Sequence, residues 1–326
     1  MNTLDSHPSL GKIRLLLITA VVLAPQILFA QWNATIGAQT TDKGRQALAF
    51  LPNEIWIHAG DKITWTFATD EPHTLTFLTE DQVRNPFFVG CPGYSPDNSP
   101  FDGSTCVSTP PMFHGQTFTV IFPSTGNFKF VCLFHENMAG AVHVLDASEP
   151  LPHDQAFYDN EAKSDRRALI AATDDTGHLT GHGAGNDVIA GVGRVVATTG
   201  GTHTVSILRF MQKRVTIHVG DTVEWGNDDP ITPHTITFGV EPQDPVPPSS
   251  NVTVDTDGAR HAVINSSSDN VHSGFIQAAP QDRIGLPQSP LGVTRFRVTF
   301  TKRGTYHYIC ALHDDLGMKG NIVVLP

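Results

Sequence analysis

The chain has 326 residues, with 32 acidic side chains against 21 basic ones and a formal net charge of −11. This balance excludes the clustered positive charge that phosphate binding needs, so no nucleic-acid partner is expected. The length accommodates two domains of ordinary size, and no segment after residue 30 is long and apolar enough for a membrane span in the mature chain.

The first predicted element is an export signal over residues 1–30. Lys12 and Arg14 precede an apolar run from Leu15 to Phe29, and Ala30 follows it. A short positive segment, a short apolar core and a small residue at the end are typical of a secretory signal peptide. We expect cleavage near Ala30 and a periplasmic or extracellular protein, with an uncleaved N-terminal anchor as the alternative.

The rest of the chain contains one pattern twice. Three blocks recur in the same order: IWIHAGDKITW at 55–65 and VTIHVGDTVEW at 215–225, PHTLTF at 72–77 and PHTITF at 233–238, and FTVIF at 118–122 and FRVTF at 296–300. Such self-similarity predicts one kind of domain present twice. We place these domains at residues 31–147 and 185–326.

Each copy is predicted to be all-β. Short runs rich in Val, Ile, Thr, Phe and Trp alternate with polar residues and are separated by Gly, Pro, Asp and Asn, which predicts an antiparallel sandwich. The linker, residues 148–184, is polar and contains one predicted short helix at about 155–172. Long loops at about 78–115 and 239–291 occupy the same place in each copy, and loops of that length usually serve function or recognition.

The four cysteines fall into two kinds. Cys91 and Cys106 flank a loop rich in turn residues that contains no His, so we predict a disulfide between them. Cys132 and Cys310 end strand-like runs, and each is followed by a His three residues later. These two need a different explanation.

Strand periodicity places one His and one Cys of each copy on an apolar face. His73 shares its face with Leu75 and Phe77, and Cys132 shares its face with Phe130. The second copy repeats this arrangement, and a loop after each Cys adds a His and a Met. Two imidazoles, a thiolate and a weak thioether form the ligand set of a blue-copper site. The predicted ligands are His73, Cys132, His135 and Met138 for one copper, and His234, Cys310, His313 and Met318 for the other.

Both copies resemble the plastocyanin/azurin family of cupredoxins. The second has the Cys-x2-His-x4-Met spacing of plastocyanin and pseudoazurin, and the first has the shorter Cys-x2-His-x2-Met loop of amicyanin. The resemblance implies two Greek-key cupredoxin β-sandwiches in tandem, with one type-1 copper each, and an electron-transfer function. It also implies that His135 and His313 lie near the surface as electron ports where redox partner proteins dock. Their apolar neighbours there would be Pro72, Pro233, Phe134 and Leu312.

Other interpretations exist for several histidines and for the identity of the metal. Zinc is disfavoured because its sites do not recruit Met. His58 and His218 recur beside a Gly-Asp turn, and we expect them on the solvent side of a strand. His178, His182 and His203 lie near the linker at irregular spacing, which favours a solvated loop.

Two other functions remain open. Two-domain copper oxidases and nitrite reductases carry His residues beside the blue-site Cys, but Cys132 lies between Val131 and Leu133, and the chain contains no His-Cys-His or His-x-His. We therefore expect no enzyme activity. A periplasmic copper carrier is the other alternative, although the chain has only five Met including the first residue.

Overall fold

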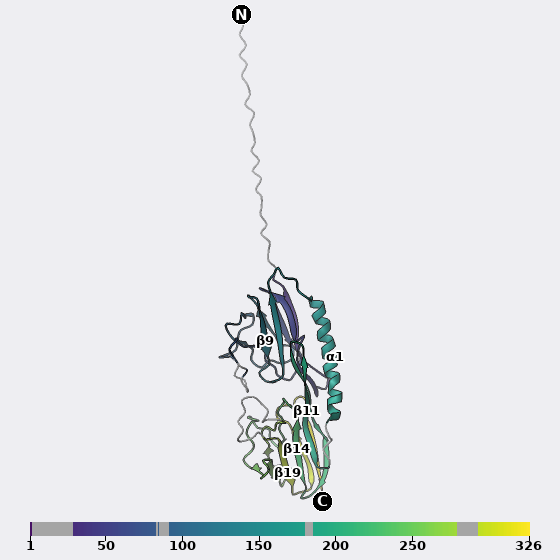
Figure 1. The fold of residues 1–326 in the computed structure, drawn as a ribbon. Coiled ribbons are helices and arrows are strands. Elements are labelled where there is room, and N and C mark those ends of the chain that lie inside the picture. Colours follow the sequence, from purple (N-terminus) through teal and green to yellow (C-terminus); the bar gives the residue numbers. More distant parts are fainter. Residues whose placement is uncertain (2–28, 83, 85–90, 180–184, 279–292) are drawn as a thin grey trace.

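A computed structural model describes residues 1, 29–82, 84, 91–179, 185–278 and 293–326. The predicted export signal falls almost entirely on residues outside this description, so it stays a prediction. The described chain is built from strands that form two β-sandwiches, with one helix that lies between them in sequence and runs along the side of the first sandwich (Figure 1). The predicted tandem all-β fold is therefore confirmed.

The first sandwich has two layers. Its strands are β1 (Gln31–Gln39), β2 (Arg45–Leu51), β3 (Glu54–His58), β4 (Lys62–Phe67), β5 (Thr76–Phe77), β6 (Ser99–Pro100), β7 (Val107–Ser108), β8 (Thr117–Ile121), β9 (Gly126–Val131) and β10 (Ala139–Leu145). One layer has the order β2-β1-β4-β8-β6, and the other has the order β3-β10-β9-β5-β7. Alternate residues of β4 such as Ile63 and Trp65 point into the core between the layers.

The second sandwich repeats this plan. Its strands are β11 (Asp187–Thr198), β12 (Gly201–Met211), β13 (Arg214–His218), β14 (Thr222–Asp228), β15 (Thr237–Phe238), β16 (Thr253–Val254), β17 (Arg260–Ile264), β18 (Val271–His272), β19 (Arg295–Phe300), β20 (Gly304–Ile309) and β21 (Lys319–Leu325). Its layers have the orders β12-β11-β14-β19-β17-β16 and β13-β21-β20-β15-β18. Trp225 is buried at the position equivalent to Trp65.

The sandwiches contain parallel as well as antiparallel pairs, so the predicted antiparallel pairing holds for only part of each sandwich. In the first domain β1 runs parallel to β4, and β3 runs parallel to β10. The second domain has the equivalent pairs β11–β14 and β13–β21. The chain crosses from one layer to the other before it returns, so strands that are distant in sequence become neighbours with the same direction.

One layer continues from the first domain into the second. Strand β12 pairs antiparallel with β2 from Thr204–Leu48 to Ile207–Arg45, and β10 meets β12 at Ala139 and Thr202. The two sandwiches therefore lie end to end and share a sheet (Figure 1). This junction determines how the two domains face each other at the ends that carry the predicted metal ligands.

The helix α1 (Gln155–Leu179) packs across this shared sheet. Asp154 caps it, with its Oδ1 accepting from the backbone N–H of Phe157 at 2.9 Å. It extends beyond the predicted end at residue 172, and in that extension the hydroxyls of Thr173 and Thr176 donate to carbonyls of the helix itself. Leu169 packs with Ala47 and other residues of the sheet. Among the described residues, no helix is long and apolar enough to cross a membrane.

Candidate metal centres

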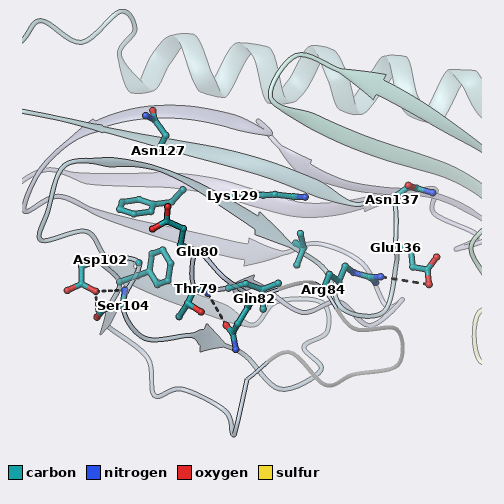
Figure 2. A pocket seen from close by; sticks show the side chains of 15 residues that line it. Thr79, Glu80, Gln82, Arg84, Asp102, Ser104, Asn127, Lys129, Glu136 and Asn137 are labelled. Atoms are coloured by element: carbon teal, nitrogen blue, oxygen red, sulfur yellow. Dashed lines mark hydrogen bonds and ion pairs between the residues drawn. The ribbon is translucent and has the colours of Figure 1, made fainter. Parts of the chain in front are cut away.

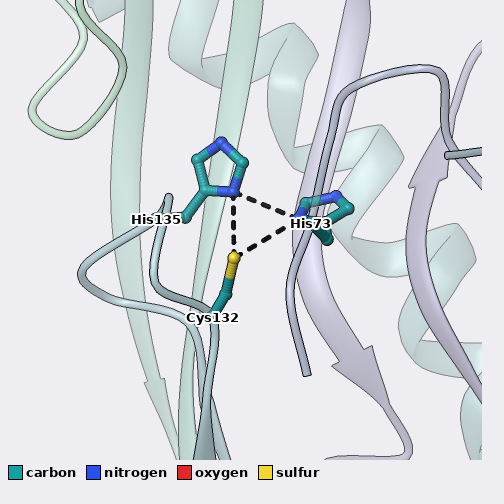
Figure 3. Close-up of side chains that lie close together, drawn as sticks. All are labelled: His73, Cys132 and His135. Carbon is teal, nitrogen blue, oxygen red and sulfur yellow. Dashed lines mark hydrogen bonds between the residues drawn. The ribbon is translucent and has the colours of Figure 1, made fainter. Parts of the chain in front are cut away.

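The first cluster brings together His73, Cys132 and His135 (Figure 3). His73 lies just before β5, Cys132 directly follows β9, and His135 lies in the loop between β9 and β10. The Cys132 Sγ is 3.8 Å from Nδ1 of His73 and 3.6 Å from Nδ1 of His135. The two Nδ1 atoms are 3.1 Å apart. Three donor atoms thus converge on one point inside the sandwich.

The second cluster has nearly the same dimensions. Cys310 Sγ is 3.8 Å from Nδ1 of His234 and 3.3 Å from Nδ1 of His313, and the two Nδ1 atoms are 3.2 Å apart. All six side chains are buried in the folded chain. The structure therefore brings the predicted His-Cys-His groups together twice, with the same atoms facing inward.

The loops that carry the second imidazole close on themselves. The N–H of Cys132 donates to the carbonyl of Met138 at 3.0 Å, and the N–H of Cys310 donates to the carbonyl of Met318 at 3.1 Å. Both methionine side chains are fully buried, each in the same core as its Cys. The loop lengths differ by two residues in the sequence, but each returns its Met to the same backbone position beside the Cys.

In each domain one threonine ties the Cys to the segment that carries the distant His. The N–H of Thr74 approaches Cys132 Sγ at 3.4 Å, and the N–H of Leu133 donates to the Thr74 hydroxyl at 2.8 Å. Thr235 makes the equivalent contacts with Cys310 and Ala311 at 3.4 and 2.7 Å. These bonds fix the distance between segments that are far apart in sequence.

The electrostatic environment of each cluster favours the thiolate form of its Cys. Burial by itself raises the pKa of Cys132, but the His135 imidazole beside it lowers that pKa well below the ordinary value, and His313 does the same for Cys310. The thiolate is the form of Cys that binds metals. Nε2 of His73 and Nε2 of His234 are buried without a hydrogen-bond partner. Two imidazole nitrogens and a thiolate are donors that fit copper, and the three donor atoms that converge in each cluster include no carboxylate oxygen.

A carboxylate that the sequence reasoning missed lies between the two clusters. Glu71 is 5% exposed, and its Oε1 is 3.3 Å from Nε2 of His135 while its Oε2 is 3.6 Å from Nε2 of His313. Burial lowers the pKa of each imidazole, but the thiolate and Glu71 outweigh it and raise the pKa to about 9 for His135 and about 10 for His313. The only sequence signal was an acidic residue two positions before His73.

The predicted surface position of the two port histidines is wrong. His135 and His313 are each only 3% exposed, because the ligand ends of the domains face each other across Glu71. The resemblance to single-domain proteins could not anticipate a second domain at this end. The apolar neighbours Phe134 and Leu312 stay partly exposed.

A hollow of about 1100 Å³ lies beside the first ligand loop (Figure 2). Arg84, from the first long loop, donates from its guanidinium to the carbonyls of Cys132 and Leu133 at 2.9–3.1 Å. It also pairs with Glu136 at 3.8 Å. The long loop therefore braces the backbone of a predicted ligand.

The other histidines singled out in the sequence whose side chains are described lie outside the two clusters. His58 contacts the carbonyl of Glu149 at 2.8 Å, and His218 is exposed, so neither joins a cluster. His203 lies on β12 and is 1% exposed, with neither ring nitrogen hydrogen-bonded, so the expectation of a solvated loop is wrong for it. It directly precedes Thr204, the residue at which the pairing of β12 with β2 begins. The side chains of His178 and His182 lie outside the described part.

The predicted disulfide between Cys91 and Cys106 is present, with the two Cα atoms 5.6 Å apart. Cys132 and Cys310 are free and buried. The four cysteines thus divide as the sequence indicates, into one cross-link on the long loop and two thiols in the clusters.

Comparisons with known proteins match both halves of the chain to one family. The family of copper-binding proteins described as plastocyanin/azurin matches residues 37–145 and 196–325. Plastocyanin from Mercurialis perennis is 28% identical over 99 residues, which are 30% of this chain and 88% of plastocyanin. Amicyanin from Paracoccus versutus is similar in structure, with 19% identity and a TM-score of 0.24 over 35% of this chain and 81% of amicyanin. A reduced amicyanin variant gives 19% identity and a TM-score of 0.25 over 35% and 82%.

Proposed function

Because the chain belongs to the plastocyanin/azurin family of copper-binding proteins, we propose that it is an exported blue-copper protein that transfers single electrons. Each domain would hold one type-1 copper. The observation that carries this proposal is the repeated convergence of two Nδ1 atoms and one Sγ in a buried cluster. Copper bound there supplies one-electron exchange between Cu(II) and Cu(I).

The residues of each domain have defined tasks in this proposal. His73, Cys132 and His135 would bind the first copper and His234, Cys310 and His313 the second, with Met138 and Met318 as the weak fourth ligands. The hydrogen bonds of Thr74 and Thr235 hold the Cys segments in place. The buried aromatic cores exclude water, and a rigid dry site needs little rearrangement when the metal charge changes.

An electron carrier is favoured over an oxidase or a nitrite reductase. The residues flanking the two cysteines are Val131 and Leu133, and Ile309 and Ala311, so no His leads from either cluster toward a catalytic copper. The two metal clusters found among the described residues are both of the His-Cys-His kind. Small redox proteins that exchange one electron are the proposed partners, and Phe134 and Leu312 are the partly exposed apolar side chains that they would contact.

An oxidising location is part of the proposal. The disulfide between Cys91 and Cys106 supports it, since such bonds persist in the periplasm or outside the cell. The apolar run from Leu15 to Phe29 supports export.

The test is spectroscopic. The copper-loaded chain should be blue and contain two copper ions per chain with type-1 EPR signals. Cys132→Ser and Cys310→Ser should each remove one of the two signals, because the thiolate–copper bond produces the colour. Copper quantification per chain checks the loading. Colourless protein with bound metal, or a substitution that leaves both signals, would refute the assignment.

A further inference from the structure

Glu71 is the residue that the family resemblance does not explain. Its side chain comes from the first domain, just before the ligand His73, and is 5% exposed. Its two carboxylate oxygens are divided between two domains, with Oε1 3.3 Å from Nε2 of His135 and Oε2 3.6 Å from Nε2 of His313. One carboxylate therefore contacts one imidazole of each metal cluster.

The second domain has no equivalent group. The repeat aligns Glu71-Pro72-His73 with Thr232-Pro233-His234, so Thr232 occupies the corresponding position. Thr232 is buried, and its hydroxyl has no hydrogen-bond partner. The arrangement is thus not a by-product of the repeat. A single carboxylate, supplied by the first domain, contacts one imidazole of the metal cluster in each domain.

Burying this carboxylate is costly. A buried charge is tolerated only when it is paired and hydrogen-bonded, and removal of a partner typically leaves an uncompensated charge. Glu71 obtains its compensation from a hydrogen bond with Nε2 of His135 and from an ion-pair contact with Nε2 of His313, while its Oε2 has no hydrogen-bond partner. The carboxylate thus lies between one imidazole of each domain where the two domains meet.

The contacts also determine how each imidazole is presented. Nδ1 of His135 faces Cys132, and Nδ1 of His313 faces Cys310. A hydrogen bond from Nε2–H to a carboxylate fixes the tautomer that leaves Nδ1 free to bind a metal, and it makes that nitrogen a stronger donor. Glu71 makes this hydrogen bond with His135 at 3.3 Å and faces Nε2 of His313 in an ion-pair contact at 3.6 Å, so one carboxylate acts on an imidazole of each cluster.

We propose that Glu71 is a positioning residue shared by the two metal centres and that it couples them through the continuous contact His135–Glu71–His313. The inference rests on the proposed function, because it concerns the copper sites of both domains. A change of metal charge at one centre polarises its imidazole, and the shared carboxylate transmits that change to the other imidazole. No covalent bond forms or breaks, and both Nε2 protons stay on their rings.

The geometry is tested first without copper. In ¹⁵N NMR spectra of the copper-free chain at constant pH, Glu71→Gln should shift the Nε2 resonances of both His135 and His313. Thr232→Val is the matched control, since it alters the equivalent buried position and should shift neither. If only one histidine responds to Glu71→Gln, the carboxylate is not shared. Glu71→Asp, which keeps the charge, provides a second variant should the amide disturb folding.

Coupling is tested in the copper-loaded chain. Glu71→Gln should weaken copper binding at both centres, by about 10–100-fold as for other carboxylates that orient metal-bound His, and should change both EPR signals. Glu71→Asp should recover part of the affinity. Removing the second copper with Cys310→Ser should shift the signal of the first, and this shift should vanish when Glu71→Gln is added.

The outcomes separate the two proposals. If the unaltered chain gives no type-1 signals, the proposed function fails, whatever the NMR spectra show. If it gives two, but Glu71→Gln leaves both signals and both affinities unchanged, the shared role of Glu71 is refuted while the function stands. A signal shift from Cys310→Ser that persists in Glu71→Gln would refute coupling through this carboxylate.

Discussion

At the scale of single residues, each centre depends on side chains that hold the ligands as much as on the ligands. Thr74 donates no metal bond but fixes the backbone after Cys132 through a 2.8 Å contact, and Arg84 braces the same backbone from the other side. Met138 and Met318 are fully buried at the ends of their loops. They can act as weak ligands or as core filling, and substitution distinguishes the two roles.

We expect Met138→Leu and Met318→Leu each to change the visible and EPR spectra of one centre only. Leu has a similar volume, so the free energy of unfolding of the copper-free chain should change by less than about 1.5 kcal/mol. A weak axial thioether tunes a blue-copper site, so its loss alters the signal and the reduction potential. Met112→Leu, in the same core as Met138, is the control. Unchanged spectra would assign the methionines to packing.

At the scale of elements, β12 is the strand that joins the domains. It pairs with β11 in its own domain and with β2 in the other. His203 lies on it with both ring nitrogens buried and unpaired, and burial lowers its pKa to about 4, from an ordinary value of 6.5. The folded chain therefore takes up a proton at this site less readily than the unfolded chain does.

This makes stability depend on pH with a definite sign. Between about pH 6.5 and about pH 4 only the unfolded chain protonates at position 203, so the free energy of unfolding falls as the pH falls. The contribution approaches about 1.4 kcal/mol per pH unit within that window. Urea unfolding of the copper-free chain should show His203→Leu losing this part of the slope. His218→Leu, at an exposed site on β13, should keep it; equal slopes in both variants and the unaltered chain would contradict the argument.

At the scale of the whole molecule, the two sandwiches are joined by more than a linker. They share a sheet through β2 and β12, and α1 packs against that sheet. The amide of Asn53 donates to the hydroxyl of Thr198 at 3.0 Å, and Arg209 donates to the carbonyl of Leu316 at 2.8 Å. Arg209 also pairs with Asp42 of the first domain. These contacts hold the ligand ends of the domains against each other.

We therefore expect the copper-free chain to unfold as one cooperative unit. Circular dichroism and tryptophan fluorescence should give coincident urea transitions, since each domain contains its own buried Trp. Arg209→Met should lower the midpoint of the whole transition and cost roughly 1–3 kcal/mol, the cost of lost hydrogen bonds to a charged group. Two separate transitions, or a shift confined to one probe, would show that the domains are independent.

The sequence by itself determined the features that depend on local pattern. Alternating apolar residues predict the strands, and the recurrence of three blocks predicts two domains. A Cys followed by a His and a Met predicts one ligand loop in each domain. The free and bonded cysteines were separated in the same way, because Cys91 and Cys106 flank a turn-rich loop whereas Cys132 and Cys310 end apolar runs. These features can be predicted because the alternation of apolar and polar residues along a strand and the spacing of residues in a loop are both visible in the sequence.

Only the tertiary structure decided what lies between the domains. The burial of His135 and His313, the sharing of Glu71 and the buried position of His203 all follow from the pairing of β12 with β2. That pairing joins residues about 160 positions apart, and no periodicity or spacing within either copy encodes it. Each copy has the sequence pattern of a complete domain, but the surroundings of its loop histidine, His135 or His313, depend on the surface of the other domain.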